Sequence, residues 1–155
     1  MALKDFLKDS TICLGVQAET SSDVIRHLGQ KLLDAGLVKD SFIEAAILRE
    51  STMPTGLPLE GSIHVAIPHT DIIHVNQAGV AMAVLAKPVI FQDMVTPSEA
   101  VIVSIVFLMA LDQPHAQIEM LSEIADILQN PDLLQRLVDA KEFQDVINAF
   151  ADVTI

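Results

Sequence analysis

Two long apolar runs lie in the middle of the chain. Residues 79–86 and residues 100–109 are almost continuously apolar, which is typical of strands covered on both faces. Residues 88–91 are predicted either to extend the first of these strands or to form an edge. The longest run, residues 100–111, is shorter than the roughly 18 residues that a membrane-spanning helix needs. We therefore interpret it as a buried strand.

A shorter strand is predicted just before His69. Residues 63–67 alternate branched aliphatic residues with His and Ala, and Pro68 then removes a donor from the strand ladder. Upstream, residues 51–61 contain two prolines and two glycines, which favour turns and predict a loop. His69 is thus expected at a strand end, where functional residues are commonly placed.

The first half of the chain also predicts a helix at residues 22–35. Apolar side chains recur there every three or four positions, as on the buried face of a helix. Ser21 or Ser22 is expected to be the N-cap, and Gly36 follows the last helical residue. These signals agree on one well-delimited helix.

A second helix is expected to begin at Asp40 or Ser41 and to continue toward Glu50. Ser41 and Glu44 have the spacing of a capping box, in which each side chain bonds a backbone N–H of the first turn. Arg49 would then lie at the C-terminal end of this helix, beside the loop.

From Pro114 onward the pattern is helical. The first of these helices is predicted to bury the face formed by Ile118, Leu121, Ala125 and Leu128. A neighbouring row of apolar residues, Met120, Ile124 and Ile127, widens this face. Asn130 and Pro131 supply a cap and a first-position proline for a helix through Val138, and another follows at residues 143–150. Helices around a central group of strands indicate a mixed α/β or α+β sandwich, with a mixed sheet flanked by helices on both sides.

Composition narrows the functional classes. The chain has 155 residues, of which 51% are hydrophobic, and we expect a single domain spanning residues 1–155. The formal net charge of -12 and the lack of a basic patch argue against a nucleic-acid partner. Cys13 is the only cysteine, and the N-terminal residues lack the apolar core of a signal peptide, so we expect a cytoplasmic protein.

Several standard chemistries have no sequence support. There is no Gly-rich phosphate loop with a Lys, no G-x-G-x-x-G, no G-x-S-x-G and no H-E-x-x-H. His64, His69 and His74 are spaced by five, but an odd spacing on a strand puts neighbours on opposite faces, and no acidic ligand pattern accompanies them. We expect no metal and no cofactor; His64 is expected on the sheet surface, and His27 and His74 on the protein surface.

The surroundings of His69 are specific. Residues 60–70, centred on Ala66-Ile67-Pro68-His69, closely resemble the phosphorylation-site signature of the fructose/mannitol class of enzyme IIA in the bacterial sugar phosphotransferase system (PTS). The Arg49-Glu50 pair, the Pro54-Thr55-Gly56 loop and Pro114-His115-Ala116-Gln117 are also similar to this family. The resemblance therefore covers essentially the whole chain.

This resemblance implies a phosphotransferase. His69 would accept a phosphoryl group from the phosphorylated carrier protein HPr and pass it to a IIB component, which phosphorylates a sugar or polyol carried by a membrane IIC permease. A neutral imidazole is a competent nucleophile at pH 7. The family places the phosphoryl group on Nε2, which requires a hydrogen bond to orient the other ring nitrogen.

Two further residues are expected to contact the phosphoryl group. Arg49 is the candidate cation, because its planar guanidinium matches phosphate oxygens; the alternative is a surface arginine that pairs with Glu50 or with its own helix end. His115 lies at a predicted helix start, where it and the backbone N–H groups can hold an anion, and family members often carry a histidine here. Its alternative is an exposed first-turn histidine.

The remaining candidates are supporting residues. Thr55 and Gly56 are expected to bring backbone close to the site, and Thr70 to offer a hydroxyl group. Glu50 is expected either to pair with Arg49 or to cap a turn. Cys13 is a rival acceptor, since some IIB proteins use cysteine, but no phosphate-binding loop follows it and we expect a buried core residue.

The sequence is compatible with more than one transported sugar or polyol and with more than one role for the protein. The segment from Pro54 to Gly61 looks most like galactitol-type members, although such relatives have Cys or Gln where this chain has Thr70 and His115, so mannitol, fructose or another polyol is also considered. The C-terminal third is acidic, which either is a solvated exterior or helps to capture a basic carrier protein. Two rivals are a regulatory module similar to the nitrogen-type IIA paralogues and a non-catalytic binding domain.

Overall fold

The computed structural model describes residues 3–152, which contain one five-stranded mixed sheet in the order β1-β4-β5-β3-β2. The central strands β4 and β5 are antiparallel to each other. On one side β1 pairs parallel to β4; on the other, β3 pairs parallel to β5 and β2 pairs antiparallel to β3. The strands are β1 (Ile12–Val16), β2 (Gly56–Leu57), β3 (His64–Ala66), β4 (Gly79–Gln92) and β5 (Ala100–Ala110). Residues 88–91 therefore extend the first long strand, one of the two predicted possibilities.

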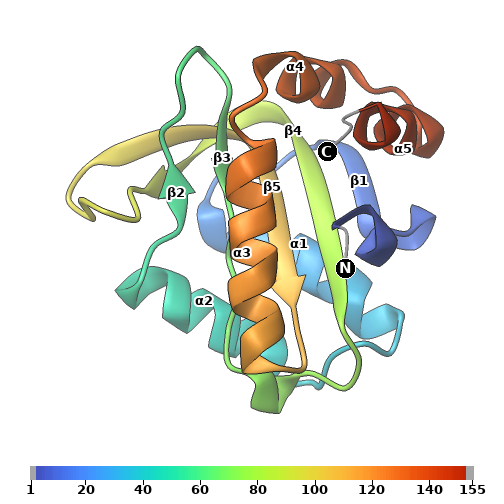
Figure 1. Cartoon of the computed structure of the whole chain (residues 1–155). Coiled ribbons are helices and arrows are strands. Elements are labelled where there is room, and N and C mark those ends of the chain that lie inside the picture. Colours follow the sequence, from blue (N-terminus) through green and yellow to red (C-terminus); the bar gives the residue numbers. More distant parts are fainter. Residues whose placement is uncertain (1–2, 153–155) are drawn as a thin grey trace.

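Helices cover both faces of this sheet (Figure 1). One face carries α1 (Ser21–Asp34) and α2 (Phe42–Thr52), and the other carries α3 (Pro114–Ile127), α4 (Pro131–Asp139) and α5 (Phe143–Ala151). Three short 3-10 helices complete the described part of the chain, namely η1 (Leu3–Phe6), η2 (Asp9–Thr11) and η3 (Ile72–His74). The predicted α/β sandwich, with a mixed sheet between two layers of helices, is confirmed.

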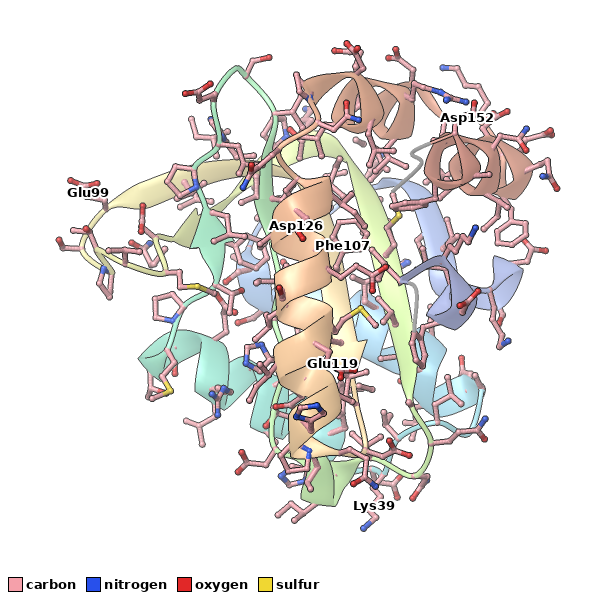
Figure 2. All side chains as sticks on the ribbon, viewed as in Figure 1. Lys39, Glu99, Phe107, Glu119, Asp126 and Asp152 are labelled. Atoms are coloured by element: carbon pink, nitrogen blue, oxygen red, sulfur yellow. The ribbon has the colours of Figure 1, made fainter. Side chains whose placement is uncertain are left out.

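The two faces arise from alternation along the central strands. On β4, Met82 belongs to the apolar cluster under α3 to α5, whereas its neighbours Ala81 and Ala83 belong to the cluster under α1 and α2. Phe107 of β5 lies beneath α3 in Figure 2 and is fully buried. Strands buried on both sides need apolar residues at nearly every position, which explains the continuous runs in the sequence.

The first helix begins and ends one residue before its predicted bounds and has a different N-cap. Thr20 caps it, because its side chain accepts a hydrogen bond of 3.2 Å from the backbone N–H of Asp23. At the other end Gly36 takes a φ of +76°, a left-handed conformation that glycine adopts without strain. The N–H of Leu37 then donates to the carbonyl of Leu32, which closes the helix in a Schellman arrangement.

The second helix lacks the predicted capping box. Ser41 is the N-cap but makes no capping bond; its hydroxyl instead contacts Nδ1 of His74 at 2.7 Å. Glu44 forms an ion pair of 2.7 Å with Arg26 on α1. Tertiary partners thus replaced the local bonds that the spacing suggested. The predicted loop at residues 51–61 is also interrupted, since α2 continues through Thr52 and β2 follows at Gly56–Leu57.

The buried face of α3 agrees with the prediction in part. Met120, Ile124, Ile127 and Leu128 are buried as predicted, together with Ala116, whereas Ile118 is 66% exposed and Ala125 is exposed. Both rows have helical spacing, so periodicity alone did not separate them.

The N-terminal strand β1 was not predicted from the sequence. This strand has five residues and follows two 3-10 turns, so it lacks a clear pattern of its own. Cys13 lies on it and is partly buried at the edge of the core, not fully buried as predicted. Among residues 3–152, no helix combines the length and apolarity needed to cross a bilayer.

Candidate functional site

His69 lies where β3 leaves the sheet, as predicted. The backbone on both sides of it is held by hydrogen bonds to neighbouring segments: the N–H of Met109 on β5 donates to the carbonyl of Pro68 at 3.0 Å, and the N–H of Ile67 donates to the carbonyl of Thr55 at 3.3 Å. The histidine is therefore anchored by a central strand on one side and by the loop after α2 on the other.

The imidazole of His69 is oriented by its own strand. Its Nδ1 lies 3.0 Å from the carbonyl oxygen of Ile67. A carbonyl can only accept, so this hydrogen bond requires the proton on Nδ1 and leaves a lone pair on Nε2. Ile67 is thus the orienting partner that the sequence could not identify.

The charge state of His69 is set mainly by burial. Burial lowers the pKa of the imidazole below 6.5, and the positive charge of Arg49 lowers it further, while the Ile67 hydrogen bond and the negative charge of Asp71 oppose the shift. The ring is therefore neutral at pH 7, with Nε2 available as a nucleophile.

His69 opens into a pocket of about 450 Å³ that several elements build together. The pocket is lined by Arg49, Thr52, Met53, Pro54, Thr55, His69, Met94, Pro97 and Leu121. These residues come from α2, the following loop, the segment after β3, the connection between β4 and β5, and α3. Three of the predicted site residues, Arg49, Thr55 and His69, are therefore brought together.

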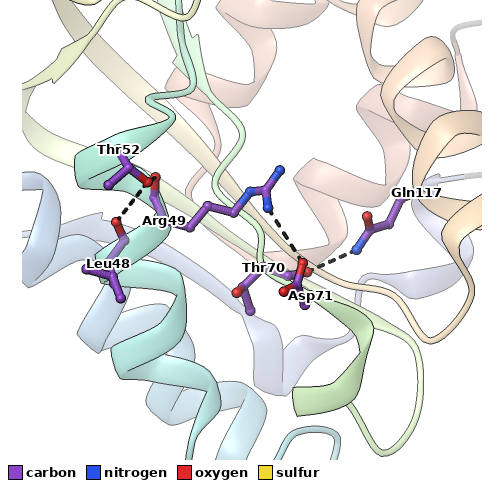
Figure 3. Close-up of polar contacts among 6 residues, drawn as sticks. All are labelled: Leu48, Arg49, Thr52, Thr70, Asp71 and Gln117. Carbon is purple, nitrogen blue, oxygen red and sulfur yellow. Dashed lines mark hydrogen bonds and ion pairs between the residues drawn. The ribbon is translucent and has the colours of Figure 1, made fainter.

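Arg49 projects from the last turn of α2 toward Asp71 (Figure 3) and is one of the residues that line the pocket. Its Nη1 lies 3.6 Å from a carboxylate oxygen of Asp71, and its side chain is 34% exposed. The guanidinium pairs with Asp71 rather than Glu50, and its buried Nε–H donor has no partner within the described residues.

Glu50 holds the loop behind the pocket. Its two carboxylate oxygens accept hydrogen bonds of 2.8 Å from the backbone N–H and from the hydroxyl of Thr55. The carbonyl of Thr55 in turn accepts from Ile67, whose own carbonyl orients His69. Glu50 is therefore the start of a chain of hydrogen bonds that ends at Nδ1 of His69. Of its two predicted roles, Glu50 has the second: it caps the turn and does not pair with Arg49.

Glu50 makes the stability of the protein depend on pH. Burial raises its pKa from 4.5 to about 7, against the two Thr55 hydrogen bonds, which lower it. The pKa of Glu50 is higher in the folded than in the unfolded protein, so its protonated carboxyl group stabilises the fold. This stabilisation is fully present below pH 4.5, decreases as the pH rises, and is lost above pH 7.

The free energy of unfolding of the wild type should therefore fall by about 2 kcal/mol between pH 5 and pH 8, and we expect this fall to be absent in Glu50→Gln. Urea denaturation at both pH values measures it, with Glu60→Gln as the exposed control; parallel pH profiles of wild type and Glu50→Gln would contradict it.

Gly56 allows two segments to approach closely beside the pocket. A Cβ atom at this position would lie 2.6 Å from the carbonyl oxygen of Gln92, so a larger residue does not fit without backbone movement. The carbonyl of Gly56 accepts a hydrogen bond of 2.9 Å from the N–H of Met94. Gly56 therefore holds the connection between β4 and β5 against the Thr55 loop.

Thr70 and His115 lie outside the set of residues that line the pocket. Thr70 is buried, and its carbonyl accepts a hydrogen bond of 3.0 Å from the side chain of Gln117 (Figure 3). His115 is on the first turn of α3 with 83% of its side chain exposed, and its Nε2 lies 3.0 Å from Glu119. Gln117 thus ties α3 to the segment that follows His69.

Sequence reasoning missed Asp71 and Gln117. Asp71 stands two residues after His69, so its position in the sequence was the available signal; Gln117 needed the tertiary fold. His27, His64 and His74 do not line the pocket. His27 is exposed, His64 accepts a hydrogen bond of 3.0 Å from the N–H of Leu59, and His74 contacts Ser41. In residues 3–152 no group of three or more His, Cys, Asp or Glu side chains is arranged to hold a metal ion.

Comparisons with known proteins give a family match and a curated relative. Residues 5–153 match the family model of the phosphoenolpyruvate-dependent sugar phosphotransferase system, EIIA 2. The galactitol-specific EIIA component of Escherichia coli K12 is 32% identical over 130 residues, which cover 84% of this chain and 85% of that protein.

Solved structures share the fold. The NMR structure of a complex of enzyme IIA-Mtl and phosphorylated enzyme IIB-Mtl from Escherichia coli contains a chain with a TM-score of 0.77 and 23% identity, over 94% of this chain and 97% of that one. The nitrogen regulatory protein IIA-Ntr of Neisseria meningitidis gives a TM-score of 0.73 at 22% identity, over 94% of this chain and 97% of that one. From the family match and the galactitol-specific relative we conclude that this chain belongs to the EIIA 2 family of the sugar phosphotransferase system, whose members are phosphotransferase relay proteins.

Proposed function

We propose that His69 is the phosphoryl acceptor of this relay protein, charged by phospho-HPr and discharged by a IIB component. The observation that carries this proposal is the state of its imidazole: Nδ1 is committed to the carbonyl of Ile67, so Nε2 is the free nucleophile, and it shares a pocket with Arg49. No nucleotide is needed, because the donor already carries an activated phosphoryl group.

The transfer balances without any further reactant. The Nε2 lone pair of His69 attacks phosphorus, the P–N bond of the donor phosphohistidine breaks, and its electron pair returns to the donor ring. When the other nitrogen of the donor ring carries a proton, that ring leaves as neutral imidazole. His69 keeps its Nδ1 proton, and the Ile67 carbonyl stabilises the positive charge that develops on the ring.

Arg49 acts on the transferred group in this proposal. The phosphoryl group carries about two negative charges, and the guanidinium offers parallel N–H donors beside His69. Glu50, Thr55 and Gly56 act indirectly, by holding the backbone that orients Ile67 and shapes the pocket. Thr70 supports the site through its carbonyl, which fastens the segment after His69 to α3.

The acidic C-terminal third of the chain suits a carrier protein with basic residues around its own site. Glu119 and Asp126 lie on the outward side of α3, and Asp152 follows α5 (Figure 2). Long-range attraction of this kind raises the rate of encounter more than the affinity, which suits a relay that must release its partners quickly. We also propose a cytoplasmic location, where IIB would phosphorylate the sugar that a membrane IIC permease carries in.

Galactitol is the substrate that we favour for the complete system. The support is the galactitol-specific relative, together with the segment from Pro54 to Gly61. The mannitol IIA chain that shares the fold was solved in complex with its phosphorylated IIB, and we propose a IIB partner for this chain by the same kind of contact.

The test is a two-step relay followed by intact mass. The protein is mixed with enzyme I, HPr and phosphoenolpyruvate, and a gain of about 80 Da, one phosphoryl group, is expected. Galactitol-type IIB is then added and should discharge the protein faster than mannitol-type IIB. A chain that stays unmodified beside active phospho-HPr overturns the carrier function, and a charged chain that no IIB discharges favours a regulatory role.

His115→Ala should slow charging by a few-fold and leave the final extent unchanged. An exposed first-turn histidine, already paired with Glu119, can add one donor to the phosphoryl group but is not the acceptor. The rate of mass gain measures this, beside Glu119→Gln, which frees His115 without removing it. Complete loss of charging in His115→Ala would contradict the assignment of His69.

A further inference from the structure

Asp71 is a carboxylate that pairs with Arg49 beside the pocket, and nothing in the proposed transfer uses it. Its carboxylate lies 3.6 Å from Nη1 of Arg49, and its side chain is 72% exposed. It stands two residues after His69, close enough for its charge to act on the imidazole. In Figure 3 the Arg49 side chain reaches from α2 across to Asp71, on the segment that Gln117 fastens to α3.

Two anions would compete for one cation once His69 is charged. Arg49 is the basic side chain among the residues lining the pocket, and Asp71 engages it while the histidine is free. A phosphoryl group on Nε2 brings about two negative charges beside the same guanidinium and beside the Asp71 carboxylate. Arg49 then leaves Asp71 partly or wholly, and Asp71 is left facing a like charge.

We propose that Asp71 is a positioning residue that holds Arg49 over the site in the uncharged protein and, by competing with the phosphoryl group for Arg49, keeps phospho-His69 a ready donor. This inference rests on the proposed function of His69. It assigns Asp71 two opposite effects: the uncharged state gains an ion pair, and the phosphorylated state loses that pair and gains a repulsion. Both effects shift the transfer equilibrium away from a stable phospho-His69, as a relay that must pass its group onward requires.

The first arm of the test uses the uncharged protein and does not depend on phosphorylation. The guanidinium resonances of Arg49 are recorded by NMR in the full chain and in Asp71→Asn, Asp71→Glu and Asp132→Asn, the last an exposed carboxylate on α4. We expect faster rotation of the guanidinium in Asp71→Asn, and wild-type behaviour in the other two. Unchanged Arg49 resonances in Asp71→Asn would overturn the proposal.

The second arm measures the equilibrium constant for phosphoryl exchange between phospho-HPr and the protein. Asp71→Asn should shift it by about threefold to tenfold toward phospho-His69 and slow discharge to IIB by a similar factor, while Asp71→Glu restores the wild-type values. In an Arg49→Gln background, given time to equilibrate, the shift should shrink because the competition for Arg49 is gone. An equilibrium constant that is unchanged or moves the other way in Asp71→Asn overturns the proposal. If wild type itself is never phosphorylated, the function of His69 fails, and the first arm still decides whether Asp71 holds Arg49.

Discussion

Replacing His69 by glutamine should abolish the mass gain of about 80 Da on incubation with enzyme I, HPr and phosphoenolpyruvate. Glutamine has a similar length and an amide that can donate to a carbonyl, but it has no nitrogen lone pair able to attack phosphorus. In the described residues the other histidines lie in different settings, with His64 occupied by a backbone N–H and His115 exposed beside Glu119. The expected loss is therefore complete, and not a reduction.

The control for this variant is His27→Gln. His27 is an exposed histidine on α1, on a helix that contributes no residue to the pocket lining, so its replacement should leave charging unchanged. Both variants should unfold at the wild-type urea concentration within error, since neither change opens the core. If His69→Gln were modified as readily as wild type, another residue would be the acceptor.

Replacing Arg49 by glutamine should slow the charging of His69 by about 10²–10³-fold. A loss of this size is typical when one preorganised hydrogen-bond donor to the charge of a transition state is removed. Arg49 is the cation that lines the pocket together with His69, and its buried Nε has no hydrogen-bond partner among the described residues. The loss should appear in the rate, measured by rapid quench and intact mass, because the nucleophile itself is intact.

Lysine and a distant arginine give the matched comparisons. Arg49→Lys should recover part of the rate, since an ammonium supplies the charge but not the planar pair of donors. Arg26→Gln, which removes an arginine paired with Glu44 at the α1–α2 contact, should charge like wild type. Equal rates for wild type and Arg49→Gln would show that Arg49 only pairs with Asp71.

Local patterns predicted the elements that carry strong local signals. The helix before Gly36 and the helix after Asn130 were correctly placed, because a left-handed glycine and an N-cap followed by proline are decided within a few residues. The Asn130 side chain does accept the predicted capping bond from the N–H of Leu133, at 3.1 Å. The five-residue β1, the order of the strands and the exposure of Ile118 on α3 depend on distant partners, and so periodicity could not supply them.

The same division holds at the site. The sequence placed His69 at a strand end and Arg49 at a helix end, and the fold brings both into one pocket. The partner of Nδ1 is a backbone carbonyl, which no side-chain motif records. The pairing of Arg49 with Asp71 rather than Glu50 required the positions of α2 and of the segment after β3.

The most direct test of the account is the identity of the phosphorylated nitrogen. Long-range ¹H–¹⁵N NMR on the phosphorylated chain, labelled at histidine, reports which ring nitrogen couples to phosphorus. The Nδ1 proton held by Ile67 at 3.0 Å predicts coupling at Nε2 of His69, with Nδ1 still protonated. Phosphorus coupled to Nδ1 of His69, or to either nitrogen of His115, would contradict the central claim.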